Sequence, residues 1–252
     1  MTSTTAEEID VNENAFDTAG FAKQALASPR ALASAIDHTL LKPEATREQV
    51  LKLCAEAAQY RFACAMVNPA WITTAYAALV GTGVPVGVVV GFPLGANLTT
   101  TKRDEAATLV RLGARELDMV LNIGLLKSGE NALVQNDIRG VAEIAHEAGA
   151  ILKVILETSL LNLEEKLRAS ELACAAGADF LKTSTGFSTA GATAADVALL
   201  RGIAGNRCGV KASGGIRTLD DARTMLEAGA NRIGASASVA IVQALDAQPM
   251  TR

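Results

Sequence analysis

A repeated unit constrains the fold most: a helix-forming segment ends at a glycine–alanine step, and an apolar segment begins at once. The step occurs at Gly113–Ala114, Gly149–Ala150, Gly177–Ala178 and Gly229–Ala230. Glycine after a helix adopts the left-handed conformation that satisfies the last carbonyl groups, so a strand can follow directly. With less regular counterparts at Gly81 to Gly83 and at Gly205, the step recurs every 24 to 36 residues. This spacing is typical of alternating strands and helices.

The apolar segments predict eight strands, each followed by a helical pattern. They are Ala35–Asp37, Phe62–Val67, Val86–Val90, Glu116–Leu121, Leu152–Glu157, Phe180–Thr183, Val210–Ser213 and Arg232–Ala235. Apolar strands that alternate with helices indicate a parallel sheet covered on both faces. Eight such units predict an α/β fold, the (β/α)8 TIM barrel, whose usual size is about 250 residues. A doubly wound sheet is the alternative, but Gly81–Thr82–Gly83 precedes its strand, whereas a dinucleotide-binding turn follows the first strand.

The chain is expected to have three regions. Residues 1–30 form an N-terminal extension, partly disordered or a helical cap, with helix expected from Phe16 to Ala33. Residues 31–247 form the barrel, and 248–252 a C-terminal tail. The acidic start has no positive segment followed by an apolar one, which argues against a secretory signal. The apolar tract Val84 to Phe92 is much shorter than the roughly 20 residues of a membrane-spanning helix.

Composition excludes several partners. Lys and Arg total 23 and Asp and Glu 27, a net charge of -4, so the chain lacks the basic surface of a nucleic-acid or anionic-membrane binder. Four scattered cysteines, without a C-x-x-C pair, indicate reduced core residues of a cytoplasmic protein. They are Cys54, Cys64, Cys174 and Cys208.

Four predicted strands carry a charged residue among apolar neighbours: Asp118, Lys153, Lys182 and Lys211. Such side chains are almost never fully buried unless they are paired. A structural ion pair explains any one of them equally well. Four together favour a functional site, because the carboxyl ends of barrel strands meet at one mouth. Lys153 and Glu157, four residues apart, are interpreted as a separate structural pair.

Lys182 and Lys211 lie in neighbouring predicted strands, so their ammonium groups should repel each other. At an effective dielectric of 20 and about 6 Å, the repulsion is roughly 2.8 kcal/mol, about two pKa units. With desolvation, this brings a lysine to a pKa of roughly 7 to 8, where part of it is a nucleophilic amine. Such an amine forms a Schiff base with a carbonyl compound. Asp118 is expected to stabilise the remaining ammonium of Lys211 and to relay protons.

Two glycine-rich turns follow the last two predicted strands, at Ser213–Arg217 and Gly234–Ser236. Barrels commonly bind phosphate there with backbone N–H groups and a helix N-terminus, so a phosphorylated substrate is expected. A histidine-bound metal is not expected, because His38 and His146 are far apart and lie in no metal-binding motif. Cys64 and Trp71 are interpreted as packing residues.

Five segments resemble the motifs of the deoxyribose-phosphate aldolase family, in the same order. They are Ile36–Leu41, Gly91–Gly95, Glu116–Val120, Phe180–Gly186 and Val210–Arg217. The resemblance runs from about residue 31 to 245, and KTSTG together with VKASGGIR is highly specific. It implies a class I aldolase, without metal or cofactor, that reversibly cleaves 2-deoxy-D-ribose 5-phosphate to D-glyceraldehyde 3-phosphate and acetaldehyde. It also makes a homodimer or homotetramer plausible.

The resemblance assigns roles by motif. It makes Lys182 the Schiff-base lysine, Lys211 the neighbour that lowers its pKa, and Asp118 the proton relay. The substrate-binding residues it implies are Asp37, Cys64, Thr183, Gly186, Gly214, Gly215, Gly234 and Ser236, the glycines and serine in the phosphate-binding turns. Phe187 and Ala237 depart from the pattern, because some members carry a lysine and a serine there. A weaker preference for phosphorylated substrate is therefore expected.

Two other functions stay open from the residues alone. Another Schiff-base lyase or transaldolase could act on a different sugar phosphate, since fold and nucleophile do not fix the substrate. A non-enzymatic sensor of phosphosugars could use its lysines only for ion pairs. Only the predicted aldolase releases acetaldehyde, which distinguishes it from another Schiff-base lyase or transaldolase. A sensor has no turnover to lose, so replacing Lys182 would change only its ligand binding.

Overall fold

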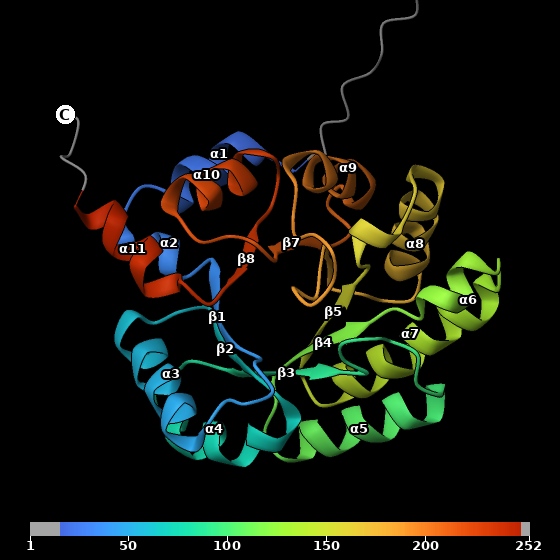
Figure 1. Cartoon of the computed structure of the whole chain (residues 1–252), viewed down its shortest axis with the longest axis horizontal. Helices are drawn as coiled ribbons and strands as arrows, with labels where there is room; N and C mark the ends of the chain where they lie inside the picture. The colour runs from blue at the N-terminus through green and yellow to red at the C-terminus, as the bar shows by residue number, and fades with distance from the viewer. Residues whose placement is uncertain (1–15, 248–252) are drawn as a thin grey trace, which may run out of the picture.

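A computed structural model describes residues 16–247. Within them, eight parallel strands close into a barrel in chain order, and helices surround it (Figure 1). The prediction of a (β/α)8 barrel is confirmed. The doubly wound sheet is excluded because β1 pairs with both β2 and β8. The first 15 residues of the predicted extension and the predicted tail 248–252 lie outside the described residues.

The strands are β1 (Ile36–Leu40), β2 (Cys64–Val67), β3 (Val86–Val90), β4 (Glu116–Val120), β5 (Ile151–Ile155), β6 (Phe180–Lys182), β7 (Gly209–Ser213) and β8 (Arg232–Ala235). The helices are α1 (Thr18–Ala25), α2 (Pro29–Ala33), α3 (Arg47–Tyr60), α4 (Ile72–Leu79), α5 (Thr99–Arg111), α6 (Ile123–Lys127), α7 (Asn131–Glu147), α8 (Leu163–Ala175), α9 (Ala194–Ala204), α10 (Leu219–Glu227) and α11 (Ser238–Asp246). Short 3-10 turns lie at Pro69–Trp71 and Thr158–Leu160. No helix in the described part of the chain has the length and apolar character needed to cross a bilayer.

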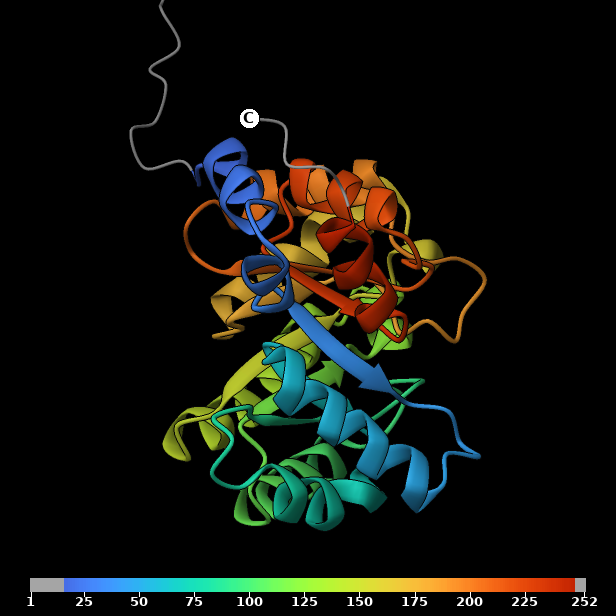
Figure 2. The same cartoon turned by 90° about the vertical axis from the view of Figure 1, so that its left-hand side faces the viewer.

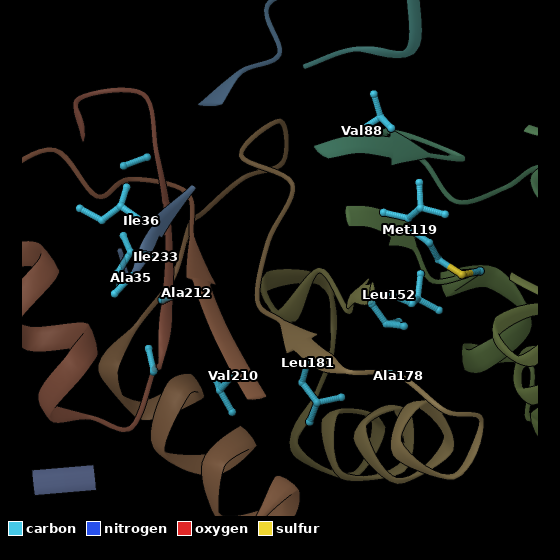
Figure 3. Packing of buried hydrophobic residues seen from close by; sticks show 14 of the residues in the cluster. Ala35, Ile36, Val88, Met119, Leu152, Ala178, Leu181, Val210, Ala212 and Ile233 are labelled. Atoms are coloured by element: carbon cyan, nitrogen blue, oxygen red, sulfur yellow. The ribbon is translucent and has the colours of Figure 1, made fainter. Parts of the chain in front are cut away.

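Side chains alternate along each strand between the helical layer and the barrel interior. Leu181 and Val210 belong to the large apolar cluster between strands and helices (Figure 3). Cys64, Met66 and Val89, from β2 and β3, form a separate small apolar cluster. The barrel interior beside this cluster holds charged side chains, and these build the site described below.

The N-terminal extension differs from the prediction, because two helices replace one over Phe16–Ala33. Ser28 accepts a hydrogen bond from the backbone N–H of Ala31 and so caps α2, whose first residue is Pro29. Proline cannot donate within a helix, so it ends the preceding helix and starts the next. α1 packs against α10 and α2 against α11 (Figure 1). Figure 2 shows α2 at the start of β1.

All eight predicted strands overlap an observed strand, and the ends differ. β1 continues to Leu40, beyond the predicted end at Asp37. β5 ends at Ile155, before the predicted end at Glu157. Glu157 has a backbone φ of 56°, in the left-handed region, which a strand does not accommodate. This change of direction takes Glu157 out of the line of β5.

Candidate active site

The four charged strand residues singled out from the sequence meet in the barrel interior. Asp118 lies at the centre and accepts hydrogen bonds from three lysines. Its Oδ1 is 2.8 Å from Lys153 Nζ, and its Oδ2 is 2.7 Å from both Lys182 Nζ and Lys211 Nζ. All four residues are buried. The prediction that these charges form one group is confirmed.

Lys182 and Lys211 are direct neighbours in register on β6 and β7. Because both contact the same carboxylate oxygen, their nitrogen atoms lie within a few ångströms of each other. Burial lowers the pKa of Lys182 to about 8, Asp118 opposes this effect, and Lys211 adds to it. The predicted lowering by a cationic neighbour is therefore present, but desolvation has the larger effect. A lysine with this pKa is partly a free amine near neutral pH.

Asp118 itself stays ionised. Burial acts to raise its pKa, but the ammonium groups of Lys153, Lys182 and Lys211 outweigh this and hold the pKa well below its usual value. Lys153 shows the converse behaviour, because Asp118 and Glu116 outweigh its desolvation and hold its pKa well above the usual value. Lys153 is therefore a permanent cation, whereas Lys182 can lose its proton.

Asp37 joins this group from β1. Its Oδ2 is 2.5 Å from Lys211 Nζ, and its Oδ1 is 2.7 Å from Arg232 Nη1. Glu116, two residues before Asp118, lies 2.5 Å from Lys153 Nζ and 3.3 Å from Arg232 Nη1. Four cations thus face three carboxylates in one buried network.

The thiol of Cys64 and the carboxylates of Asp37 and Glu116 bring three possible metal ligands within 4.8 Å of one another. Both carboxylates already bind lysine or arginine, as described above. Burial raises the pKa of the Cys64 thiol well above its usual value, which disfavours the thiolate that metals bind. The chemistry of this donor set therefore fits cationic side chains better than a metal ion.

A cavity of about 410 Å³ opens beside Lys182 at the carboxyl ends of the strands. Five of the predicted site residues line it together with Lys182: Gly186, Gly214, Gly215, Gly234 and Ser236. The remaining predicted residues, Asp37, Cys64, Thr183, Asp118 and Lys211, are not among its lining residues. Asp37, Cys64, Asp118 and Lys211 lie in the barrel interior. Thr183 joins β6 to β7, because its hydroxyl accepts from the N–H of Ser213 and donates to that residue's carbonyl.

The turn after β7 depends on glycine. Gly214 and Gly215 have φ values of 88° and 81°, a region that residues with a side chain rarely adopt. A Cβ atom on Gly214 would also lie 3.0 Å from the Cα of Gly191. The bare backbone of this turn can therefore come close to a ligand in the cavity.

The interpretation of Lys153 and Glu157 as a pair is wrong. Lys153 points into the barrel, toward Asp118 and Glu116. The carboxylate of Glu157 accepts from the backbone N–H and the hydroxyl of Thr185. The left-handed backbone at Glu157 separates the two side chains. Glu157 thus fastens the loop that follows Lys182.

Three residues of the site were not identified from the sequence. Glu116 and Arg232 belong to the charged network, and Lys42 lines the cavity together with Arg217 of the predicted phosphate-binding turn. A signal for Glu116 was available, since residues two apart on a strand face the same side, and Asp118 was already placed in the interior. No comparable signal marked Lys42, which is an exposed residue after β1.

The other cysteines and the histidines lie elsewhere. All four cysteines are free, and the Sγ atoms of Cys174 and Cys208 lie 2.9 Å apart. His38 contacts Glu56, and His146 contacts Asp179. The two histidines therefore have separate carboxylate partners.

A lysine of lowered pKa at the mouth of a (β/α)8 barrel, beside a carboxylate and a second lysine, defines an enzyme of the Schiff-base-forming class. The sequence model of the DeoC/LacD family of aldolases matches residues 31–244. The chain belongs to this family.

Individual relatives agree with this assignment. The chain is 56% identical over 211 residues to the deoxyribose-phosphate aldolase of Bacillus mycoides (strain KBAB4), covering 84% of this chain and 94% of that protein. A structure of a putative deoxyribose-phosphate aldolase from Coccidioides immitis is 44% identical, with a TM-score of 0.84 over 87% of both chains. The deoxyribose phosphate aldolase from Aeropyrum pernix, described as a unique tetramer, is 38% identical, with a TM-score of 0.85 over 92% of this chain and 97% of that one.

Proposed function

We propose that this protein is a class I aldolase that reversibly cleaves 2-deoxy-D-ribose 5-phosphate to D-glyceraldehyde 3-phosphate and acetaldehyde. The observation that carries the proposal is Lys182, a buried lysine with a pKa of about 8 that lines the cavity and contacts Asp118. The deoxyribose-phosphate aldolases among the relatives support the substrate. The chemistry uses the lysine amine itself and requires no metal or cofactor.

In the proposed mechanism, the neutral amine of Lys182 attacks C1 of the open-chain sugar. The carbinolamine loses water to give a protonated Schiff base. Removal of the proton from the C3 hydroxyl breaks the C2–C3 bond, whose electron pair moves into the Schiff base and forms an enamine. D-glyceraldehyde 3-phosphate leaves. Protonation at C2 and hydrolysis then release acetaldehyde and the free lysine.

The neighbours of Lys182 have distinct proposed roles. Asp118 accepts a proton from Lys182 only transiently, passes it on and returns to its ionised resting state, since its Oδ2 lies 2.7 Å from the amine. Lys211 forms ion pairs with both Asp118 and Asp37. Its positive charge favours the neutral amine of Lys182.

The phosphate is proposed to bind at the glycine-rich end of the cavity. Gly214, Gly215, Gly234 and Ser236 offer backbone N–H groups and a hydroxyl there. Arg217 and Lys42 line the same cavity, and both can attract a dianion. This end lies beside Lys182, so a short phosphorylated sugar can reach the amine.

Trapping the intermediate tests this function. The protein is incubated with acetaldehyde and borohydride, digested, and analysed by mass spectrometry. We expect the reduced two-carbon adduct on Lys182, because a free amine is required for Schiff-base formation. The yield should rise with pH through about 8, the pKa of this lysine. A main adduct on another lysine would overturn the assignment, and a failure to form acetaldehyde from the sugar phosphate would overturn the proposed function.

Phe187 provides a test of phosphate recognition. Its side chain is half exposed, lines the cavity and packs edge-on against Phe92. We expect Phe187→Lys to raise the ratio of kcat/KM for 2-deoxyribose 5-phosphate over 2-deoxyribose by about tenfold, because it adds a cation near the dianion. Phe187→Met, which removes the ring without adding charge, should leave the ratio within about twofold. An equal change in both variants would contradict the electrostatic explanation.

We also infer that the protein works in the cytoplasm as a homodimer or homotetramer. The four free cysteines support a reducing compartment. The tetramer described for the relative from Aeropyrum pernix supports self-association. Small phosphorylated sugars and aldehydes, and no nucleic acid or membrane, are its proposed partners.

A further inference from the structure

Two charged residues lie beneath the catalytic group and do not line the cavity. Glu116 and Arg232 are the first residues of β4 and β8, and both point into the barrel, where they contact each other at 3.3 Å. Glu116 also contacts Lys153 at 2.5 Å, and Arg232 contacts Asp37 at 2.7 Å. Both have little solvent exposure. This pair is therefore placed to act on the site through other side chains.

We propose that Glu116 and Arg232 are positioning residues that set the protonation state of Lys182, and so the pH range in which the enzyme works. The inference rests on the proposed function, because it concerns the same nucleophile. It differs from a purely structural role, in which the pair would hold β4 and β8 together without affecting the charge of the amine.

Two chains of ion pairs connect this pair to Lys182. On one side, Glu116 contacts Lys153, and Lys153 contacts Asp118 at 2.8 Å. On the other side, Arg232 contacts Asp37, and Asp37 contacts Lys211. Both chains end at Asp118, the carboxylate that contacts Lys182. A change at either lower residue therefore changes how strongly Asp118 can hold the proton of Lys182.

The charges around Lys182 give the direction of each effect. The titratable side chains of the barrel interior around it are Asp37 on β1, Cys64 on β2, Glu116 and Asp118 on β4, Lys153 on β5, Lys211 on β7 and Arg232 on β8. Lys42 and Arg217 line the cavity on its other side and are the same in all the variants below. On β3, the corresponding positions are Gly87 and Val89, which do not titrate. With Cys64 as a thiol, three negative charges oppose four positive ones when Lys182 is protonated. Loss of the Lys182 proton brings the net charge of the network to zero.

Removing one charge from the lower pair should disturb this balance in a predictable direction. In Glu116→Gln, Lys153 loses one of its carboxylates and interacts more strongly with Asp118. Asp118 then stabilises the ammonium of Lys182 less, and the pKa of Lys182 falls. In Arg232→Gln, Asp37 loses its arginine and interacts more strongly with Lys211. Asp118 then interacts more strongly with Lys182, and the pKa of Lys182 rises. The two variants should therefore move the pKa of Lys182 in opposite directions.

The test is the dependence of kcat/KM on pH for 2-deoxyribose 5-phosphate cleavage. Activity requires the free amine, so it should rise with pH through the pKa of Lys182. We expect Glu116→Gln to shift this inflection to lower pH, and Arg232→Gln to shift it to higher pH, each by about half a unit or more. The double variant, which removes one charge of each sign, should return toward the wild-type inflection.

Charge-retaining variants are the controls. Glu116→Asp and Arg232→Lys alter size and geometry but keep the charge, so we expect their inflections within about 0.2 units of wild type even where kcat falls. Thermal unfolding checks that each variant is folded. If either Glu116→Gln or Arg232→Gln does not fold, the other variant is compared with its charge-retaining control, and this comparison tests the inference. If neither folds, Glu116→Met and Arg232→Met remove the same charges with an apolar side chain, and the same shifts in opposite directions are required of them.

A purely structural role would lower kcat without moving the inflection. Shifts in the same direction, or none, in folded Glu116→Gln and Arg232→Gln would overturn the inference. This failure is distinguishable from failure of the proposed function. If wild-type protein releases acetaldehyde but the inflections of the variants do not move, only the positioning role is refuted. If wild-type protein releases no acetaldehyde, the proposed aldolase activity itself is refuted.

Discussion

Replacing Lys182 with methionine should abolish aldol cleavage while leaving the barrel folded. Methionine has nearly the length of lysine but no amine, so the Schiff base cannot form. Lys211 does not line the cavity, and Lys42, which does, is exposed to solvent. Lys211 contacts Asp118 without reaching the cavity, and Lys42 lines the cavity but has no ion pair with Asp118, so neither combines the two features that Lys182 has. We expect kcat to fall by about 10⁴-fold or more, as for other nucleophile deletions.

The fold should tolerate this change. Lys182 is one of three lysines on Asp118, so Lys153 and Lys211 still compensate the carboxylate in the variant. The measurements are acetaldehyde release and the thermal unfolding midpoint. Lys127→Met is the matched control, because Lys127 is a partly exposed lysine of α6 that pairs with Glu165, outside the cavity. The control should keep its activity, and a Lys182→Met protein with activity within about tenfold of wild type would refute the assignment.

The fold could be predicted from the sequence because its signals are local. Each glycine–alanine step ends a helix, and each apolar segment that follows pairs with its neighbour along the chain. The N-terminal extension was predicted less well, since Ser28 and Pro29 separate two short helices where one was expected. The end of β5 was also wrong, because the left-handed backbone at Glu157 is not evident from residue type.

The site could be predicted only in part. Charged residues inside apolar strands indicated Asp118, Lys182 and Lys211, because burial of a charge requires a partner. The identity of each partner depends on barrel closure. Asp37 and Lys211 are separated by 174 positions in sequence and meet only because β1 pairs with β8. From the sequence, the lowered pKa of Lys182 was therefore attributed mainly to Lys211, whereas desolvation, which depends on the complete enclosure, is the larger cause.

Asp118→Asn should have the second large effect, on both activity and stability. The carboxylate is fully buried and accepts hydrogen bonds from three lysines. Asparagine keeps the shape but removes the charge, so Lys153 and Lys211 become poorly compensated in the interior. Loss of one partner from a buried ion pair typically costs about 3–5 kcal/mol of the free energy of unfolding. The proton relay is also lost, and we expect kcat to fall by about 10³-fold, within the usual range for general acid–base groups.

Asp137→Asn separates these two effects. Asp137 is a buried carboxylate of α7 that contacts Lys102 at 2.5 Å outside the barrel interior, so it makes a similar ion pair without facing the cavity. This control should lose stability, because Lys102 becomes uncompensated, but its kcat should stay within about threefold of wild type at a temperature where both are folded. Urea unfolding and acetaldehyde release measure the two quantities. Equal losses of kcat in folded Asp118→Asn and Asp137→Asn would show that the activity of the first variant falls through instability, and that Asp118 relays no proton.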